Sequence, residues 1–581
     1  MVSGGDTRVA GGPADASVDA GADAGRRTAR LFFVCLGLFM VYLDTTIVNV
    51  ALPQIQRSLD VGVTGLQWVF DGYVLTFACF LLTSGRLGDV LGRRRVFLIG
   101  LAGFTVASVA CALSQNITAL LVARFVQGAF GSVMITVSLA LVHSMYQSPA
   151  ARARAVSVWA GIGGLALAAG PVLGGILVEQ VNWQSIFWLN LPVGVVSVIA
   201  LLLLPTTVEN YERRHLDLTG QALLVLAVGA LTYGLIEAST EGWTARPILG
   251  TFAGAVVATL LFLWREARCA EPMLPLGFFR NRVLVFACAI NFLAFFGLFG
   301  ALFLLSLYLQ AVNGLSAVAT GVRFLALSLA IATASVVAPR LAQRAGRGYA
   351  LVSAAGALLA CLGLAGLLRL HVGSGFGSYW WALVLLGVGV SFAVAPATVA
   401  LLAAVPPERA GVAAGASQTF RQLGGVVGVA LSGTLALQHV RRGLPNAMSE
   451  LALPQPVKEQ LTGALRDGRL SSIGDVPPAL RATVIDHIGP LLVSGMTMAL
   501  GVGSAVALVG VLTPLLLLHR ADAEQPEGSE PQNNQENQDA EKPTDASGAE
   551  DDGTSGVDGD GASGVDGDGV PGVGKSPLVD G

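Results

Sequence analysis

Three charged residues stand inside long apolar runs of this 581-residue chain. Asp44 lies in the middle of the first run, Asp71 lies early in the second, and Arg124 lies early in the fourth. A charge at the centre of a membrane helix costs about 2.5–3.5 kcal/mol, so such side chains usually face a partner or a water-filled cavity. A carboxyl group in that setting can bind and release a proton, whereas a guanidinium stays charged. We therefore treat Asp44, Asp71 and Arg124 as candidates for proton coupling, with structural ion pairing inside one helix bundle as the alternative.

The apolar runs that carry these residues dominate the composition. Hydrophobic residues make up 53% of the chain and charged residues only 13%, against about 25% charged in soluble domains. A membrane helix needs roughly 20 apolar residues, and fourteen segments meet this requirement. They are approximately 31–52, 66–87, 96–113, 119–146, 156–178, 185–204, 220–237, 248–264, 283–309, 317–338, 351–368, 380–405, 412–437 and 490–518. The sequence thus predicts an all-α, polytopic membrane protein.

Arginines are distributed unevenly between the two sets of connecting loops. If the N-terminus is cytoplasmic, the inside loops contain Arg93, Arg152, Arg265, Arg340 and Arg409, whereas the short outside loops contain few basic residues. Cytoplasmic loops of membrane proteins carry this excess of Lys and Arg. With an even number of spans, both termini are predicted to be cytoplasmic, in a multi-pass protein of the plasma membrane.

A weak internal repeat suggests how the spans are grouped. GRLGDVLGRRR at residues 85–95 follows the second segment, and RLAQRAGR at 340–347 follows the tenth as a degraded copy. Internal repeats are typical of secondary transporters. We predict a 6+2+6 arrangement with a disordered N-terminus and a disordered acidic tail. The predicted parts are 1–30, a first bundle 31–206, an inserted pair 207–281, a second bundle 282–518 with an outside loop 438–488, and the tail 519–581.

The position of a P-loop-like match in the tail and the spacing of the cysteines argue against an ATPase and a zinc protein. Residues 569–576 match the P-loop pattern formally, but a P-loop needs a strand before it and a helix after it, and here it lies near the end of the tail. The six cysteines form no CxxC and no Cys/His cluster with zinc spacing. We expect no ATP, no metal, no cofactor and no nucleic-acid partner, and no nucleophile or cofactor constellation marks an enzyme.

Small and charged residues single out two further helices. The fifth segment contains Gly170, Pro171, Gly174 and Gly175; small residues four apart let helices pack closely, and proline can kink a helix. This pattern suits a sliding or rocking interface, with ordinary packing as the alternative. The thirteenth segment contains Arg421 and Gln422 inside an apolar run.

Together these motifs resemble the major facilitator superfamily, and specifically its fourteen-helix drug:proton antiporter branch. The loop after the second helix matches with Gly85, Asp89, Gly92, Arg93 and Arg94. The first-helix motif matches as LDTTIVNVALP at 43–53, and the fourth-helix motif as LVARFVQG at 121–128, which adds Gln127 to the candidates. GP at 170–171 with GG at 174–175 resembles the exporter motif of the fifth helix, and PPERAGV at 406–412 followed by Arg421 and Gln422 resembles the signature of the thirteenth. The second-half loop copy lacks its acid, and neither tail has a counterpart in the family.

The resemblance implies that two bundles rock about a central cavity and that the proton-motive force drives export. Asp44 would be the titrating acid, Arg124 would help its proton leave or arrive, Asp71 would be a second acid, and Asp89 with Arg93 would hold the inward gate. The expected cargo is a small amphiphilic drug, antibiotic or metabolite; the two acids favour cationic or neutral compounds. We expect a monomer in the lipid bilayer. A proton-coupled or facilitative nutrient transporter and a membrane sensor or scaffold are the alternatives.

Overall fold

The computed structural model describes residues 13–146, 148–204, 217–269, 271–344, 348–406, 409–451 and 453–518. Over these residues the chain is helical and contains no strand, and fourteen helices are long and apolar enough to cross a membrane. The all-α, polytopic prediction is confirmed. The helices are α1 Pro13–Leu59, α2 Val63–Leu91, α3 Arg93–Ala112, α4 Ile117–Met145, α5 Pro149–Gln180, α6 Ser185–Trp188, α7 Asn190–Leu203, α8 Leu218–Glu241, α9 Arg246–Arg268, α10 Arg282–Leu307, α11 Ala317–Arg344, α12 Gly348–Leu367, α13 Trp380–Ala403, α14 Ala410–Ser449, α15 Gln455–Arg466 and α16 Pro478–Leu518.

Several helices are longer than the apolar segments that predicted them. α1 begins at Pro13, inside the stretch 1–30 that we expected to be disordered, because alanine and arginine favour helix where no apolar run exists. α14 continues past Gln438, and α16 begins at Pro478, so most of the predicted outside loop is helical. α15 adds a short helix, Gln455–Arg466, within the same loop. The structure describes the degraded copy of the loop motif at 340–347 only as far as Arg344. The predictions for 1–12 and 519–581 lie outside the described residues.

Glycines bring neighbouring helices into backbone contact. A Cβ atom placed on Gly424 of α14 would lie 2.1 Å from the carbonyl oxygen of Phe292 on α10, and one on Gly428 would lie 2.3 Å from that of Phe296. Such close approach is how membrane helices gain packing contacts without a hydrophobic driving force between them. The high glycine content of the sequence therefore serves helix packing here.

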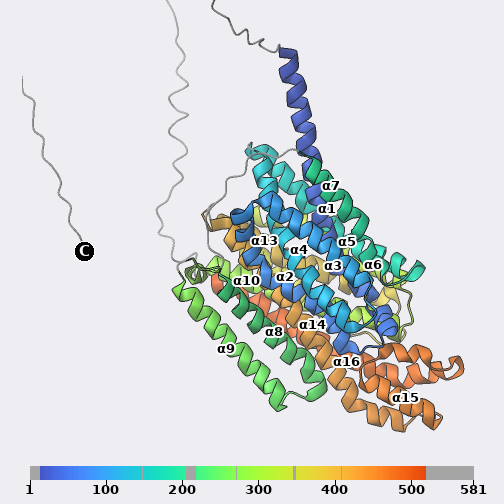
Figure 1. Cartoon of the computed structure of the whole chain (residues 1–581). Helices are drawn as coiled ribbons and strands as arrows, with labels where there is room; N and C mark the ends of the chain where they lie inside the picture. The colour runs from blue at the N-terminus through green and yellow to red at the C-terminus, as the bar shows by residue number, and fades with distance from the viewer. Residues whose placement is uncertain are drawn as a thin grey trace, which may run out of the picture. The chain divides into compact units, whose positions relative to one another are not determined.

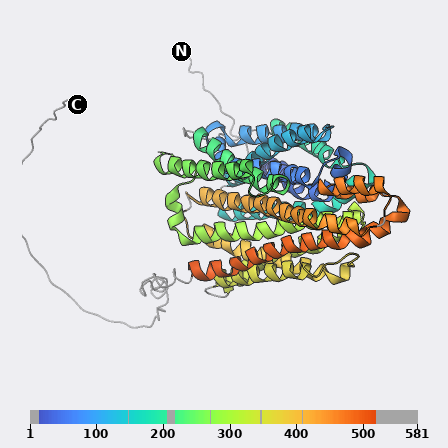
Figure 2. The same ribbon diagram turned by 90° about the horizontal axis from the view of Figure 1, so that it is seen from below.

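The inserted pair α8 and α9 lies side by side at the edge of the bundle (Figures 1 and 2). Thr83 of α2 donates a hydrogen bond to Gln221 of α8. Near the other end of α8, Thr434 of α14 donates to the carbonyl of Leu235 at 2.8 Å. The pair thus contacts helices from both parts of the chain. The division of the chain into two six-helix bundles with an inserted segment at residues 207–281 stays a prediction.

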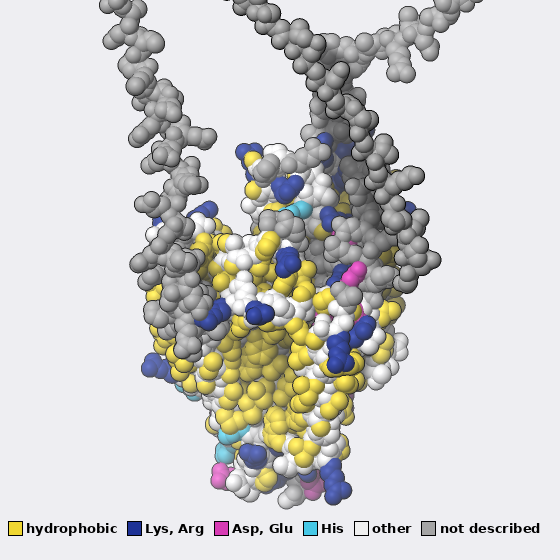
Figure 3. All heavy atoms as spheres, turned by 90° about the vertical axis from the view of Figure 1, so that its left-hand side faces the viewer, with side chains coloured by type: hydrophobic (Ala, Val, Ile, Leu, Met, Phe, Trp, Pro, Cys, Tyr) yellow, Lys and Arg dark blue, Asp and Glu magenta, His cyan; other side chains and the backbone are white. Residues whose placement is uncertain are grey.

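Figure 3 shows one face of the molecule as a band of hydrophobic side chains, with most Lys and Arg side chains above and below it. Large apolar side chains such as Leu203, Leu260 and Val257 are exposed on the surface of the helices. Exposed apolar side chains on this scale fit a lipid environment rather than water.

Candidate functional site

Asp44 and Arg124 meet in the interior of the first half of the chain. Oδ2 of Asp44, on α1, lies 2.6 Å from a terminal guanidinium nitrogen of Arg124, on α4, and both side chains are at most 1% exposed. Gln127, one turn after Arg124, donates its amide to Oδ1 of Asp44 at 3.1 Å and accepts from Arg124 at 2.7 Å. Arg124 also donates to the carbonyl of Val69 on α2 at 3.1 Å. Three residues singled out by the sequence thus form one hydrogen-bonded cluster.

A second ring of side chains holds this cluster in place. Ser108 of α3 accepts a hydrogen bond from Gln127 at 2.7 Å and another from Asn190 of α7 at 2.9 Å. The guanidinium of Arg124 lies 4.3 Å from the ring centroid of Tyr73. The sequence analysis missed Ser108, Asn190 and Tyr73, although polar residues inside apolar runs were a usable signal for the first two.

Binding of a proton by Asp44 would change the electrostatic balance of this cluster. Inside a protein two unit charges interact more strongly than in water because the effective dielectric constant is low. Protonation of Asp44 would remove the negative partner of Arg124 and leave a buried cation, so the surrounding helices would have to rearrange or admit water. A buried ion pair does not by itself indicate that a protein is more stable. The presence of this pair therefore points to a role in function.

Asp71 lies apart from this cluster. Its side chain is fully buried on α2, and neither carboxyl oxygen has a hydrogen-bond partner among the described residues. Gln67, one turn earlier on the same face, donates to the carbonyl of Ala430 on α14 at 2.7 Å. Asp71 therefore lies on the face of α2 that meets the second half of the chain, rather than beside Asp44 and Arg124.

The loop motif forms a compact turn between α2 and α3. Gly92 has a φ of 92°, a conformation that L side chains rarely adopt, which explains the glycine. Asp89 pairs with Arg93 at 3.1 Å, and Arg94 donates to the carbonyl of Leu204 at 3.0 Å. A Cβ on Gly85 would meet only Thr136 of α4, at 3.5 Å, among the described atoms. In this conformation Asp89 and Arg93 pair with each other within the first half, so their predicted role in holding a gate remains a prediction.

The glycine motif of α5 packs against both halves of the chain. A Cβ on Gly170 would lie 2.0 Å from Thr46 of α1, and one on Gly174 would lie 2.7 Å from Ile47. On the opposite side, a Cβ on Gly175 would lie 2.7 Å from the carbonyl of Ala317 on α11. The carbonyl of Pro171 itself lies 2.1 Å from where a Cβ of Gly321 would be. The motif thus forms a close contact between α5 and a helix that must move relative to it if the halves rock.

The two halves meet firmly at the end of the bundle that carries residues 438–488, which we call the cap end. Gln310 of the π-helical turn Tyr308–Val312 donates to the carbonyl of Val50 at 3.0 Å, and Val318 donates its backbone N–H to Glu179 at 3.0 Å. Both contacts link the first half of the chain to the second. The backbone carbonyl of Asn49 likewise accepts a hydrogen bond from Ser306.

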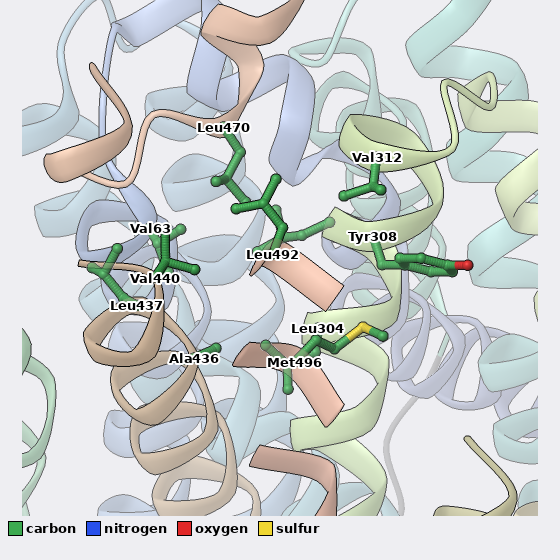
Figure 4. Close-up of a pocket in the computed structure, with 12 residues that line it drawn as sticks. Val63, Leu304, Tyr308, Val312, Ala436, Leu437, Val440, Leu470, Leu492 and Met496 are labelled. Carbon is green, nitrogen blue, oxygen red and sulfur yellow. The ribbon is translucent and has the colours of Figure 1, made fainter. Parts of the chain in front are cut away.

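The cap segment adds a further set of contacts across the same end. Gln56 of α1 donates to the carbonyl of Gly468 at 3.0 Å and accepts from the N–H of Ser471 at 3.0 Å. Arg469 pairs with Asp60 at 2.9 Å. Figure 4 shows an apolar pocket beneath this segment. Its lining is Val63, Leu304, Leu307, Tyr308, Val312, Gly433, Ala436, Leu437, Val440, Leu470, Leu492 and Met496.

The opposite end, where the Arg-rich loops lie, is less tightly packed. A Cβ on Gly161 or Gly164 of α5, or on Gly411 of α14, would have no described atom within 4 Å. One on Gly415 would meet only Leu82 of α2, at 3.6 Å, in the described part of the chain. The hydrogen bonds between the halves described above thus lie at the cap end, whereas these glycines near the Arg-rich end have open space beside them.

Arg421 and Gln422 lie on α14, in the second half of the chain. Gln422 is buried, whereas Arg421 is partly exposed. The Arg421 guanidinium lies 4.0 Å from the ring centroid of Phe295 on α10 and donates to Gln418 at 3.4 Å. Among the described residues neither of them is a hydrogen-bond or ion-pair partner of Asp44, whose partners are Arg124 and Gln127. Over the described residues, no group of three or more His, Cys, Asp or Glu side chains lies close enough together to hold a metal.

Comparison with known proteins identifies the family. Residues 34–429 match the Major Facilitator Superfamily. The chain is 37% identical over 500 residues to the tetracenomycin C resistance and export protein of Streptomyces glaucescens, with 84% of this chain and 91% of that protein covered. It is 36% identical to the multidrug resistance protein Stp of Mycobacterium tuberculosis, with 82% and 89% covered.

A solved structure supports the same fold. The bacterial homologue of the human lysosomal transporter Spinster, in an inward-facing and unoccupied conformation, superposes with a TM-score of 0.57 at 16% identity, with 85% of this chain and 98% of that chain covered. The fourteen spans and the resistance proteins among the relatives agree with the drug-antiporter branch that the sequence motifs indicated. The chain therefore belongs to the Major Facilitator Superfamily.

Proposed function

We propose that this protein is a proton-coupled antiporter that exports small amphiphilic drugs, antibiotics or metabolites across the plasma membrane. The observation that carries the proposal is the Asp44–Arg124–Gln127 cluster, a titratable acid paired with a cation at full burial inside a transporter fold. The relatives of this chain include the tetracenomycin C resistance and export protein, which supports the proposal that the chain exports such compounds.

Asp44 is proposed as the group that links proton movement to opening. In the conformation described, its charge is balanced by Arg124 and the halves are joined at the cap end. Cargo bound from the cytoplasmic side would let the cap-end contacts open while Asp89 and Arg93 close the Arg-rich end. After the cargo leaves, a proton taken up by Asp44 from the outside would remove the charge balance and return the bundle to the conformation described, where the proton is released to the cytoplasm and the pair with Arg124 forms again. With both termini cytoplasmic, as predicted, the described conformation is the one that takes up cargo from the cytoplasm.

The proton-motive force is large enough for useful export. One proton moving inward gains about 2.3 kcal/mol per 100 mV. Because about 1.4 kcal/mol corresponds to a factor of ten, this supports roughly a fiftyfold concentration gradient per charge. A transport cycle of this kind needs no bound cofactor.

Reconstituted protein tests the proposal directly. Proteoliposomes would be prepared acidic inside, so that proton efflux from the lumen drives uptake of added compound by molecules inserted with the Arg-rich end outward. Tetracenomycin C, named in one of the relatives, is the first probe. We expect uptake that stops when a protonophore collapses the gradient.

The same assay separates export from the alternatives. Uptake driven by a gradient of the opposite sign would indicate a symporter, and uptake unaffected by the protonophore would indicate a facilitator. A variant with Arg442→Gln, an exposed arginine on α14, serves as the control for altered charge.

A further inference from the structure

Arg421 is a cation without a described acidic partner. Its guanidinium lies over the Phe295 ring and has one weak side-chain hydrogen bond to Gln418, while its Nε is buried with no hydrogen-bond partner in the described part of the chain. The Nε2 amide nitrogen of Gln418 is likewise buried without a partner there. Buried donors left unpaired are costly and rare in native proteins. Two of them side by side indicate that something accepts from them in another state of the protein.

These donors lie where the two halves of the chain face each other. Phe295 belongs to α10, and Tyr42 of α1, from the first half, lies within electrostatic range of Arg421. Tyr42 also lies 3.0 Å from where a Cβ of Gly163 on α5 would be. Arg421 is therefore bordered by helices of both halves rather than buried within one bundle.

A path of small residues leads to this position. Gly411, Ala414, Gln418 and Arg421 follow each other at helical spacing on one face of α14, and all four are partly or fully exposed. Side chains three and four apart share a face of a helix. The stripe starts at the Arg-rich end, where a Cβ on Gly411 would meet no described atom. Gln418 and Arg421 are the first polar side chains on this face after Gly411 and Ala414.

The signs of the remaining charges favour an anion. Asp44 is already paired with Arg124, so its charge is not offered to a ligand. Asp71 on α2 is fully buried and has no hydrogen-bond partner among the described residues, so in this conformation it neither pairs with Arg421 nor reaches a ligand. The acids of the sequence favoured cationic or neutral cargo, but the arrangement of the side chains favours the opposite sign. Arginine is suited to this role because its planar guanidinium binds carboxylates in bidentate fashion and stacks on aromatic rings.

We propose that Arg421 and Gln418 form a binding site for the anionic group of an amphiphilic cargo. The group is a carboxylate or an ionised phenol, which would accept from Arg421 and Gln418, while the buried ring of Phe295 holds the guanidinium in place from the other side. This inference rests on the proposed function, since it assigns a class of cargo to the interface between the halves of the same transporter.

Equilibrium binding to purified protein in nanodiscs tests the site without any gradient. The probes are anthracene-9-carboxylate, anthracene-9-methanol and 9-(aminomethyl)anthracene, which share one fluorescent ring system and differ in charge. We expect the carboxylate to bind at least tenfold more tightly than the alcohol, and the ammonium compound to bind most weakly. Arg421→Gln should abolish the preference, Arg421→Lys should keep part of it, and Arg442→Gln on the same helix should leave it unchanged.

Each other result overturns the site. Equal affinities of the native protein for all three probes, absence of saturable carboxylate binding, or an unchanged preference in Arg421→Gln would each contradict it. If Arg421→Gln does not fold, the ranking of the three probes on the native protein and on Arg421→Lys still decides. Binding is measured without a gradient, so a failure of proton-driven transport in the liposome assay would not change the measured preference for the carboxylate probe. Failure of the binding site and failure of the proposed function are therefore distinguishable.

Discussion

The interior of the first half and the interface between the halves treat buried polar groups differently. In the interior, Asp44, Arg124 and Gln127 bond one another, and Ser108 and Asn190 continue the network. At the interface, both oxygens of Asp71, the side-chain oxygen of Gln67 and the Nε of Arg421 have no partner among the described residues. A satisfied network specifies one arrangement of its helices.

The difference suggests a division of roles. A surface that forms and breaks during each cycle cannot satisfy its polar groups equally in every conformation, so unpaired groups gather where the contacts change. The interior cluster has to persist while the halves rock, and it changes only when a proton is bound. The predictions below test whether the two regions respond to substitution as differently as this account requires.

The largest effect on stability is expected in the interior. Arg124→Gln would leave Asp44 buried without its cation, and breaking a buried pair from one side costs about 3–5 kcal/mol. The double variant Asp44→Asn with Arg124→Gln should recover most of this loss, because no charge remains buried. Denaturant unfolding in detergent measures both, and a double variant no more stable than Arg124→Gln would contradict the account.

The next effect is expected in the glycine contact between α5 and α11. Gly321→Ala would place a Cβ against the carbonyl of Pro171, and overpacking of this kind costs about 1–3 kcal/mol. That cost falls on the cap-closed conformation, which shifts the balance of conformations by about five- to hundredfold. We expect a lower transport rate in proteoliposomes.

A matched glycine substitution provides the control. Gly161→Ala adds the same methyl group on α5, where no described atom lies within 4 Å, and should transport like the native protein. Equal rates for Gly321→Ala and Gly161→Ala would show that the close contact is not needed for the cycle.

A smaller effect on stability is expected at Asp71. Its oxygens have no partner to lose, so Asp71→Asn should change the free energy of unfolding by less than about 1 kcal/mol. The same change at Asp44 would break contacts with Arg124 and Gln127 and should cost more. Thermal unfolding of the two single variants compares them, and a larger loss for Asp71→Asn would reverse the distinction between interior and interface.

The smallest effect is expected at the cap. Asp60 and Arg469 form an exposed ion pair, and such pairs contribute about 0.2–1 kcal/mol. The hydrogen bond from Arg469 to Asp60 raises the pKa of Arg469, so the arginine stays charged throughout the working pH range. Asp60→Asn should therefore increase hydrogen exchange over residues 469–475 only slightly, and less in 1 M salt, where the native pair is screened. A large increase would show that this pair, rather than Gln56, holds the cap.

Much of the fold could be predicted from the sequence because apolar runs of about 20 residues have one stable outcome in a bilayer. The fourteen spans followed from hydropathy, and the motifs singled out Asp44, Arg124 and Gln127, with ion pairing inside one bundle as the alternative for the two charged residues. The long extensions of α14 and α16 did not, since helix continuing into water carries no apolar signal. The isolation of Asp71 was also hidden, because depth along a helix can be counted from the sequence but the face that a side chain presents to its neighbours depends on packing. Ser108 and Arg421 acquire their roles only from residues distant in sequence.

Proton movement on addition of cargo tests the central role of Asp44 most directly. Everted vesicles loaded with a pH-sensitive dye and made acidic inside would receive tetracenomycin C while the membrane voltage is held at zero with valinomycin and potassium. We predict that the compound dissipates the pH gradient in vesicles with the native protein and leaves it intact with Asp44→Asn, although the variant is present at the same level. Dissipation of the gradient by Asp44→Asn at the native rate would contradict the assignment of Asp44 as the coupling acid.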